Sequence, residues 1–159
     1  MANPVYLTLN DVLQGLISAG CSSLAAIGNK AQITHMDQII VLGLSHGMTR
    51  AQNVNHQTLV LQKPVDKSSP LLSKAITENE CLTSYFEYYR TKRFSVNEMY
   101  YKVKLIKVRI ASIKHIVPHT ITNSQGQPEE SVSLTYESIS QEHFIVGTSA
   151  YSLWEERIF

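Results

Sequence analysis

The chain has 159 residues, 43% of them hydrophobic, and 14 basic against 13 acidic side chains leave a net charge of +1. This length suits a single domain over residues 1–159 with its own core, and it is short for a doubly wound hydrolase sheet. The near-neutral charge supplies no overall field to attract nucleic acid or an anionic membrane, and two cysteines make no disulfide framework.

The N-terminal third lacks the pattern of an export signal. No charged residue lies between Val12 and Asn29, and the first basic residue, Lys30, follows this apolar stretch instead of preceding it. A cleaved signal peptide needs its basic residues first, and the interspersed Gly, Ser and Gln residues dilute the stretch too far for a membrane span. We therefore expect a soluble, cytoplasmic chain without membrane insertion, which could leave the cell only by another route.

Apolar runs predict strands along most of the chain. Early strands are expected at VYLTL, at the buried run IIVLGL and at QTLVLQK, and later ones at residues 82–90, 99–117 and 131–139. The chain does not alternate strands with helices, which disfavours a parallel α/β sheet. The sequence therefore predicts a mainly β protein.

One segment, DKSSPLLSKAITENE, has helical periodicity. Ser68 or Ser69 is the expected N-cap, and Pro70 suits the first turn because its missing N–H would be unpaired there. Asn79 is expected to end the helix in a left-handed conformation. The apolar stripe consists of Leu71, Leu72, Ala75 and Ile76. We expect this single short helix to pack on the outside of the β structure.

The GLSHG stretch, Gly43–Gly47, matches the G-x-S-x-G pattern of serine hydrolases. In those enzymes a helix follows the serine. Here the next residues, MTRAQNVNHQ, are polar and lack helical apolar spacing, so Ser45 is not expected to be a nucleophile even with His46 and His56 nearby. We expect no catalytic residue, and a serine hydrolase remains the alternative interpretation.

Metal and nucleic-acid binding receive little support. His115 and His119 are four residues apart, but they lie in a strand-like run that Pro118 interrupts, so we expect no metal and no cofactor. Basic residues alternate with apolar ones from Lys102 to Arg109, close to two tyrosines, which leaves a nucleic-acid-binding sheet as a second alternative. A solvated outer face explains the same alternation, and we expect no nucleic acid.

The long strand predicted at residues 99–117 changes phase halfway. Apolar side chains occupy odd positions up to Leu105 and even positions from Ile106 onward. A bulge or sharp bend at this point would keep the apolar side chains on one side of a curved sheet.

Taken in order, several blocks resemble the haemolysin-coregulated protein family, Hcp, the tube protein of the bacterial type VI secretion system. The blocks are PVYLTL, THMDQIIVLGLSHGM, NVNHQTLVLQKPVDKSSPLLSKAI, the tyrosine-rich strand, SLTYESI and YSLWEER. The most specific of them is KPVDKSSPLLSKA, because it leads straight into the predicted helix.

The resemblance implies a fold and a structural role. The fold is a compact β-barrel of two sheets with one short α-helix packed on its side. The role is that of a subunit without catalysis or cofactor, which forms homohexameric rings that stack into a hollow tube. The tube is secreted by the type VI system without a cleaved signal peptide. The implied partners are the chain itself, spike and sheath components, and small effector proteins carried in the lumen.

Two features differ from the shorter members of the family. The N-terminal segment QGLISAGCSSLAAIGNK is longer and more apolar than the charged loop of many members, which implies a different ring surface there. The sequence also ends at Phe159, soon after YSLWEER, so we expect a tube or carrier subunit and not a toxin fusion.

The polar stretch after GLSHG is the candidate assembly site. It is longer than an ordinary hairpin loop and offers little to bury. In the resembling family an extended loop here helps one ring to engage the next, and modest polar contacts repeated around a ring would permit both assembly and disassembly. The expected ring-stacking residues are Met48, Thr49, Arg50, Gln52, Asn53, Asn55 and His56.

Overall fold

The computed structural model describes residues 3–28, 31–92, 97–123 and 125–155. Lys30, at the end of the apolar N-terminal segment, and the last residues of YSLWEERIF lie outside these ranges. The strands are β1 (Val5–Asp11), β2 (Gly15–Leu16), β3 (Ile39–Val41), β4 (Gly43–Ser45), β5 (Met48–Arg50), β6 (Val54–His56), β7 (Leu59–Pro64), β8 (Leu82–Thr91), β9 (Asn97–Ile116), β10 (Glu129–Thr135), β11 (Ser138–His143) and β12 (Thr148–Leu153). The helical elements are α1 (Leu24–Ile27), a 3-10 turn at Ile33–His35 and α2 (Ser69–Thr77).

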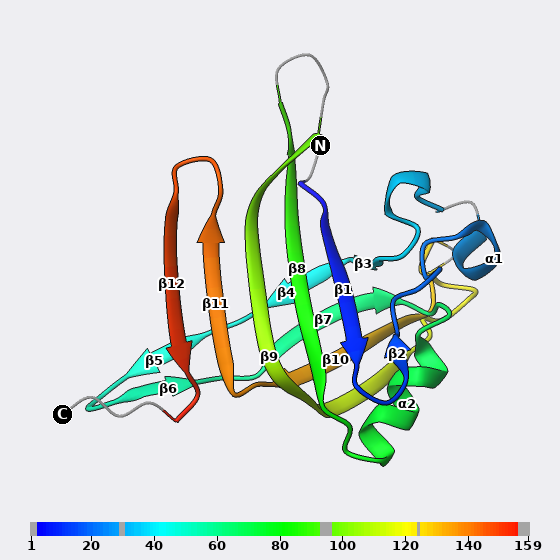
Figure 1. Ribbon diagram of the computed structural model, residues 1–159. Helices are drawn as coiled ribbons and strands as arrows, with labels where there is room; N and C mark the ends of the chain where they lie inside the picture. Colours follow the sequence, from blue (N-terminus) through cyan, green and yellow to red (C-terminus); the bar gives the residue numbers. More distant parts are fainter. Residues whose placement is uncertain (1–2, 29–30, 93–96, 124, 156–159) are drawn as a thin grey trace.

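Strand β9 belongs to two sheets that cross each other (Figure 1). Its first half pairs with β8 and β11, and its second half pairs with β10, all antiparallel. One sheet continues through β8 to β1, and the other continues through β10 to β7 and β4. This confirms the predicted mainly β fold of two sheets.

The barrel is open and not fully closed. Within the described residues the path of paired strands ends at β2 and β4. β3 pairs with β1 and β4 pairs with β7, so the segment from residue 39 to residue 45 passes from one sheet to the other. This segment therefore connects β1 of one sheet to β7 of the other through two short ladders. The sequence predicted a single buried strand here.

The bend in β9 lies where the change of apolar phase predicts it. Leu105 pairs with Ser84 of β8, and Val108 pairs with Leu82. β9 therefore has two residues between these pairs where β8 has one. Lys107 has φ 52°, in the left-handed region that side chains other than glycine rarely adopt. The extra residue turns both Leu105 and Val108 into the core, where neither is exposed, and leaves Ile106 only partly buried. The predicted bulge is therefore confirmed.

Helix α2 packs its apolar stripe onto this core, as predicted. Leu72 and Ala75 are buried in it, whereas Leu71 and Ile76 are partly exposed. Asn79, just beyond the helix, has φ 52° and confirms the left-handed stop. No helix in the described ranges combines the length and the apolar character that crossing a bilayer requires.

Ser68 is the N-cap residue of α2, as predicted, but its side chain does not make the expected capping hydrogen bond. The Ser68 hydroxyl donates to Asp66 Oδ1 at 2.5 Å, and the Ser69 hydroxyl accepts a hydrogen bond from the Asp66 amide at 3.1 Å. Both serines are engaged by the turn that precedes the helix, so their oxygens do not receive the free amides of the first helical turn. The Asp66 carboxylate organises this turn, because it also accepts from the Ser68 amide at 2.9 Å.

A buried ion pair holds that turn against the second sheet. Lys63, at the end of β7, is fully buried, and its Nζ lies 2.7 Å from Glu130 Oε2 and 3.1 Å from Asp66 Oδ1. The other Glu130 oxygen lies 2.9 Å from His115 Nε2. Because a buried charge without a partner destabilises a fold by several kcal/mol, these contacts fix where α2 begins relative to β7 and β10.

The apolar N-terminal segment contributes to the core instead of forming only surface. Ile17 and Cys21 are each 1% exposed and belong to the main apolar cluster, and burial raises the pKa of the Cys21 thiol to about 11. Ser22 ties the segment down by donating to the Gln38 carbonyl at 2.5 Å. The short helix α1 in this segment was not predicted.

We predict that Leu72→Asp destabilises the protein by more than about 4 kcal/mol, because it places an unpaired charge in the core. Ile76→Asp should destabilise it less, since Ile76 is partly exposed. Ser73→Asp, at an exposed position of the same helix, is the matched control and should change stability little. Thermal and denaturant unfolding measure all three, and an unchanged Leu72→Asp transition would show that α2 is not part of the core.

Candidate assembly site

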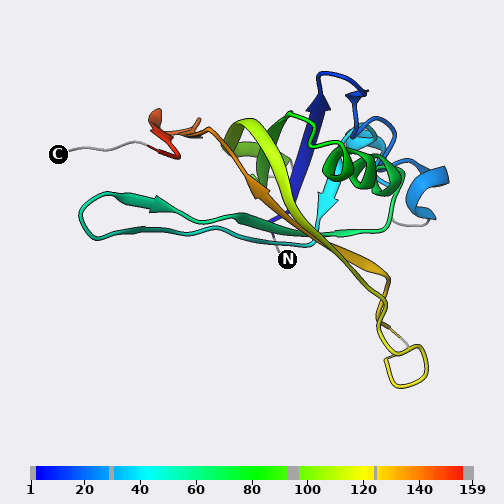
Figure 2. The ribbon, with the colours of Figure 1, turned by 90° about the horizontal axis from the view of Figure 1, so that it is seen from below.

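The polar stretch after GLSHG forms a two-stranded hairpin and not an irregular loop. β5 and β6 pair antiparallel from Met48 opposite His56 to Arg50 opposite Val54, and residues 51–53 make the turn. The hairpin is a separate small sheet that projects away from the barrel (Figure 2). We call residues 46–57 the arm.

Most of the predicted stacking residues lie on the surface of the arm. Met48, Thr49, Arg50, Gln52 and Asn55 are exposed, and Asn53 in the turn is partly buried. His56 differs from the others, because it is only 3% exposed and lies at the base. Sequence reasoning therefore located the arm but did not separate its exposed tip from its buried anchor.

One hydroxyl joins the two strands of the arm to the barrel. His46 Nε2 and His56 Nδ1 each lie 2.7 Å from the hydroxyl of Tyr136, in the link between β10 and β11. The other ring nitrogen of His56 lies 2.8 Å from Ser152 Oγ on β12. Both strands of the arm are thus anchored at its base by residues that come much later in the chain.

Aromatic packing and burial set the protonation of this anchor. Trp154 stacks on the His56 ring, with centroids 5.8 Å apart and planes at 22°, and meets Tyr136 edge-on at 4.9 Å. Burial raises the pKa of Tyr136 to about 12, so its hydroxyl keeps its proton near neutral pH. Desolvation lowers the pKa of His46, and the nearby charge of His56 lowers it further.

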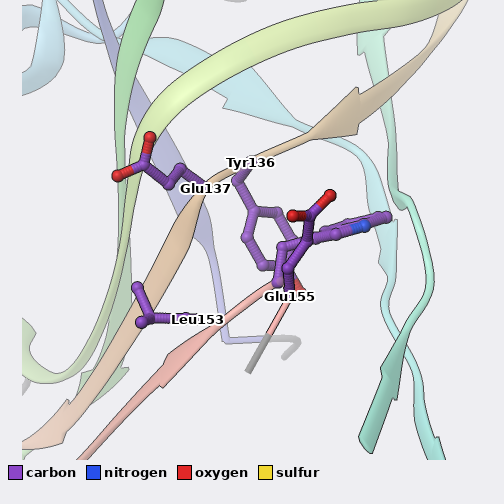
Figure 3. Close-up of a pocket in the computed structure, with 5 residues that line it drawn as sticks. Tyr136, Glu137, Leu153 and Glu155 are labelled. Carbon is purple, nitrogen blue, oxygen red and sulfur yellow. The ribbon is translucent and has the colours of Figure 1, made fainter. Parts of the chain in front are cut away.

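An open hollow of about 450 Å³ adjoins the anchor (Figure 3). It is lined by Tyr136, Glu137, Leu153, Trp154 and Glu155. A second hollow shares Tyr136, Glu137 and Trp154 with the first and is lined also by Lys107 and Arg109. The Lys107 ammonium lies 3.1 Å from the Glu137 carboxylate. Aromatic side chains and arginine are enriched at protein–protein interfaces.

The GLSHG motif forms the root of the arm. Gly43–Ser45 is β4, and the next element is the strand β5, so the helix of a nucleophile elbow does not follow Ser45. His46, the nearest candidate base, contacts Tyr136. A Cβ on Gly47 would lie 2.9 Å from the side-chain oxygen of Gln57, and the Gly47 carbonyl accepts a hydrogen bond from the Gln57 amide at 3.0 Å. A larger residue at this position would therefore require the end of the flexible Gln57 side chain to move.

The histidines considered for zinc have other partners. His115 contacts Glu130, and His119 Nδ1 accepts from the Thr122 amide at 3.2 Å. In the part of the chain that the structure describes, no three His, Cys, Asp or Glu side chains are arranged to hold a metal ion.

The basic side chains considered for nucleic acid also have partners within the chain. Lys102 and Lys104 lie over the Tyr85 ring, at 4.7 and 5.3 Å from its centroid. Lys107 pairs with Glu137, as described above.

Comparisons with known proteins identify the architecture. A family model described as "Type VI secretion system effector, Hcp" matches residues 6–143. The chain belongs to the Hcp family, the tube proteins of type VI secretion. The Major exported protein of Pseudomonas aeruginosa is 33% identical over 171 residues, which cover 99% of each chain. The uncharacterized protein YhhZ of Escherichia coli K12 is 35% identical over 155 residues, which cover 93% of this chain and 37% of that protein.

Solved Hcp structures share the fold over nearly the whole chain. A crystal structure of an Hcp protein has a TM-score of 0.91 and 30% identity, and the match covers 98% of this chain and 99% of that one. The secreted protein Hcp3 from Pseudomonas aeruginosa has a TM-score of 0.87 and 33% identity, with 98% and 100% covered. The resemblance inferred from the sequence blocks is therefore confirmed.

We predict that Ser45 does not react as a nucleophile, because the residue lies at a strand end without the turn and helix that activation by a base requires. The purified protein should not be labelled by a fluorophosphonate probe at any time point that labels a control esterase completely. Labelling that disappears in Ser45→Ala would contradict this prediction and restore the hydrolase interpretation.

Proposed function

We propose that this Hcp protein is the structural subunit of a type VI secretion tube. Acting as one domain, it forms homohexameric rings that stack into a hollow tube, and the tube carries small effectors in its lumen. The protein is cytoplasmic before assembly, meets spike and sheath components, and is then secreted without a cleaved signal peptide. Family membership supports the tube, and the name of the 33%-identical Major exported protein supports export.

The anchored arm is the observation that carries the stacking part of this proposal. Its exposed side chains are mostly polar, and its base is held by Tyr136, in the link between β10 and β11, and by Ser152 of β12. A segment that is already ordered loses less conformational entropy on binding than a mobile loop does. Because every subunit of a ring presents the same arm, weak polar contacts act together and still allow the tube to come apart.

The proposed role is structural and not enzymatic. The nucleophile motif forms the root of the arm, and the imidazoles beside it contact Tyr136. These residues hold a projecting element in place, which is what an assembly subunit requires.

We predict that replacing Thr49–Asn55 with a Gly-Ser turn leaves single rings intact but stops tube growth and secretion, because the contact between successive rings is lost. Size-exclusion chromatography with light scattering measures the rings, and negative-stain electron microscopy and secretion assays measure the tubes. Ala51→Ser, at an exposed position of the turn outside the expected stacking residues, is the matched control and should grow tubes.

Each assay can contradict a different part of the proposal. Normal secretion by the shortened variant would show that the arm does not stack rings. Loss of the ring itself would move the arm to the contact between neighbours within one ring. A stable monomer of the unaltered chain at high micromolar concentration would contradict the proposed ring formation.

A further inference from the structure

The hydrogen bonds that anchor the arm depend on the protonation of the His46 and His56 imidazoles, which share the Tyr136 hydroxyl. The Tyr136 hydroxyl has one hydrogen to donate and two lone pairs. His46 Nε2 and His56 Nδ1 both lie 2.7 Å from it, and His56 Nε2 lies 2.8 Å from Ser152 Oγ. The three side chains and Ser152 therefore form one continuous hydrogen-bonded chain.

This chain can be fully hydrogen-bonded with no extra proton or with one. If His46 is protonated, it donates to Tyr136, which donates to His56, and His56 donates to Ser152. If His56 is protonated, it donates to both Tyr136 and Ser152, and Tyr136 donates to His46. In each case the phenolic hydrogen and the ring nitrogens that face Tyr136 and Ser152 all have a partner.

A second added proton breaks this arrangement. Both imidazolium rings then donate to the Tyr136 oxygen, so the phenolic hydrogen loses its acceptor in the chain. Two positive charges also face each other across a single oxygen, in a site where His56 is almost completely buried. An unpaired buried donor and a repulsion between like charges both disfavour the anchored state.

Neighbouring groups define the electrostatic setting of the anchor. The charged side chains that line the two hollows beside the base are Lys107 and Arg109 of β9, Glu137 after β10 and Glu155 after β12. Lys107 and Glu137 compensate each other at 3.1 Å. β12 itself contributes the uncharged Ser152, and the charged residue of the arm, Arg50, lies beside the turn at the far end from the base.

We propose, on the basis of the tube function proposed above, that His46, Tyr136 and His56 form an acid-sensitive latch. The latch holds the arm in place while at most one imidazole is protonated, and it releases the arm when both are. Mild acid would then remove the ordered arm that ring stacking requires, and so would regulate tube growth.

The direction of the pH dependence follows from His46. Desolvation, with a further contribution from the charge of His56, lowers its pKa in the latched state. A solvated histidine in the released arm has an ordinary pKa of about 6.5. The latch is therefore at full strength above this pH, and it weakens as the pH falls below it, because the released state takes up a proton that the latched state holds poorly.

Trp154 gives a direct measurement. It is the only tryptophan of the chain and stacks on His56, so its emission reports on the anchor. We expect a change in Trp154 emission between pH 7 and pH 5. Over the same range, hydrogen exchange of the β5 and β6 amides, corrected for the intrinsic effect of pH, should rise by up to about tenfold per pH unit, the limit for uptake of one proton. Tube growth should fall in parallel.

Substitutions separate the latch from other titrating groups. His46→Gln retains an amide that can bond to Tyr136 but cannot titrate near neutral pH, so the transition should vanish and tubes should persist at pH 5. Tyr136→Phe should release the arm at every pH. His119→Gln, at an exposed histidine outside the arm, and Glu155→Gln, beside the anchor, are matched controls that should keep the transition.

The outcomes distinguish the latch from the tube function. A wild-type protein without the transition, or a His46→Gln protein that keeps it, would overturn the latch even if shortening the arm stops tube growth. The transition together with normal tube growth by the shortened variant would instead overturn the proposed stacking role, and with it the regulation of assembly.

Discussion

The shared strand β9 is the constraint on which the rest of the structure depends. The additional residue near Lys107 lets one continuous strand leave the first sheet and enter the second while its apolar side chains stay in the core. β10 and β11 follow the two halves of β9, so the link between them must cross the same bend. The Glu137 amide donates to the Ile106 carbonyl there at 3.0 Å. Tyr136, which anchors the arm, is placed by this crossing.

The bend and α2 were predictable because their signals are local. The change of apolar phase at Leu105 and Ile106 lies within one strand, and the stripe and stop of α2 lie within one short segment. The burial of Lys63 also had a local signal that was not used, since it continues the inward positions of Leu59 and Leu61. The carboxylate that makes this burial tolerable, Glu130, is 67 residues away along the chain and is brought close only by the fold.

The arm shows where sequence reasoning reaches its limit. Its length and polarity indicated a loop that serves a partner, but short polar strands have no apolar alternation that would predict their pairing. The burial of His56 depends on Tyr136 and Ser152, which are 80 and 96 residues away. The candidate site therefore had a predictable surface and an unpredictable base. The position of the α2 cap was predictable, but its side-chain hydrogen bond is absent because Asp66 engages both serines.

The arm is nearly continuous with the ladder that joins β4 to β7, which has a mechanical consequence. β5 follows β4 and β6 leads into β7, and β7 in turn lies beside β10 over six residue pairs. A pull along the arm therefore acts parallel to these strands and loads many hydrogen bonds at the same time, instead of opening them one by one. The barrel should resist such tension much better than a force that peels β4 sideways from its neighbour.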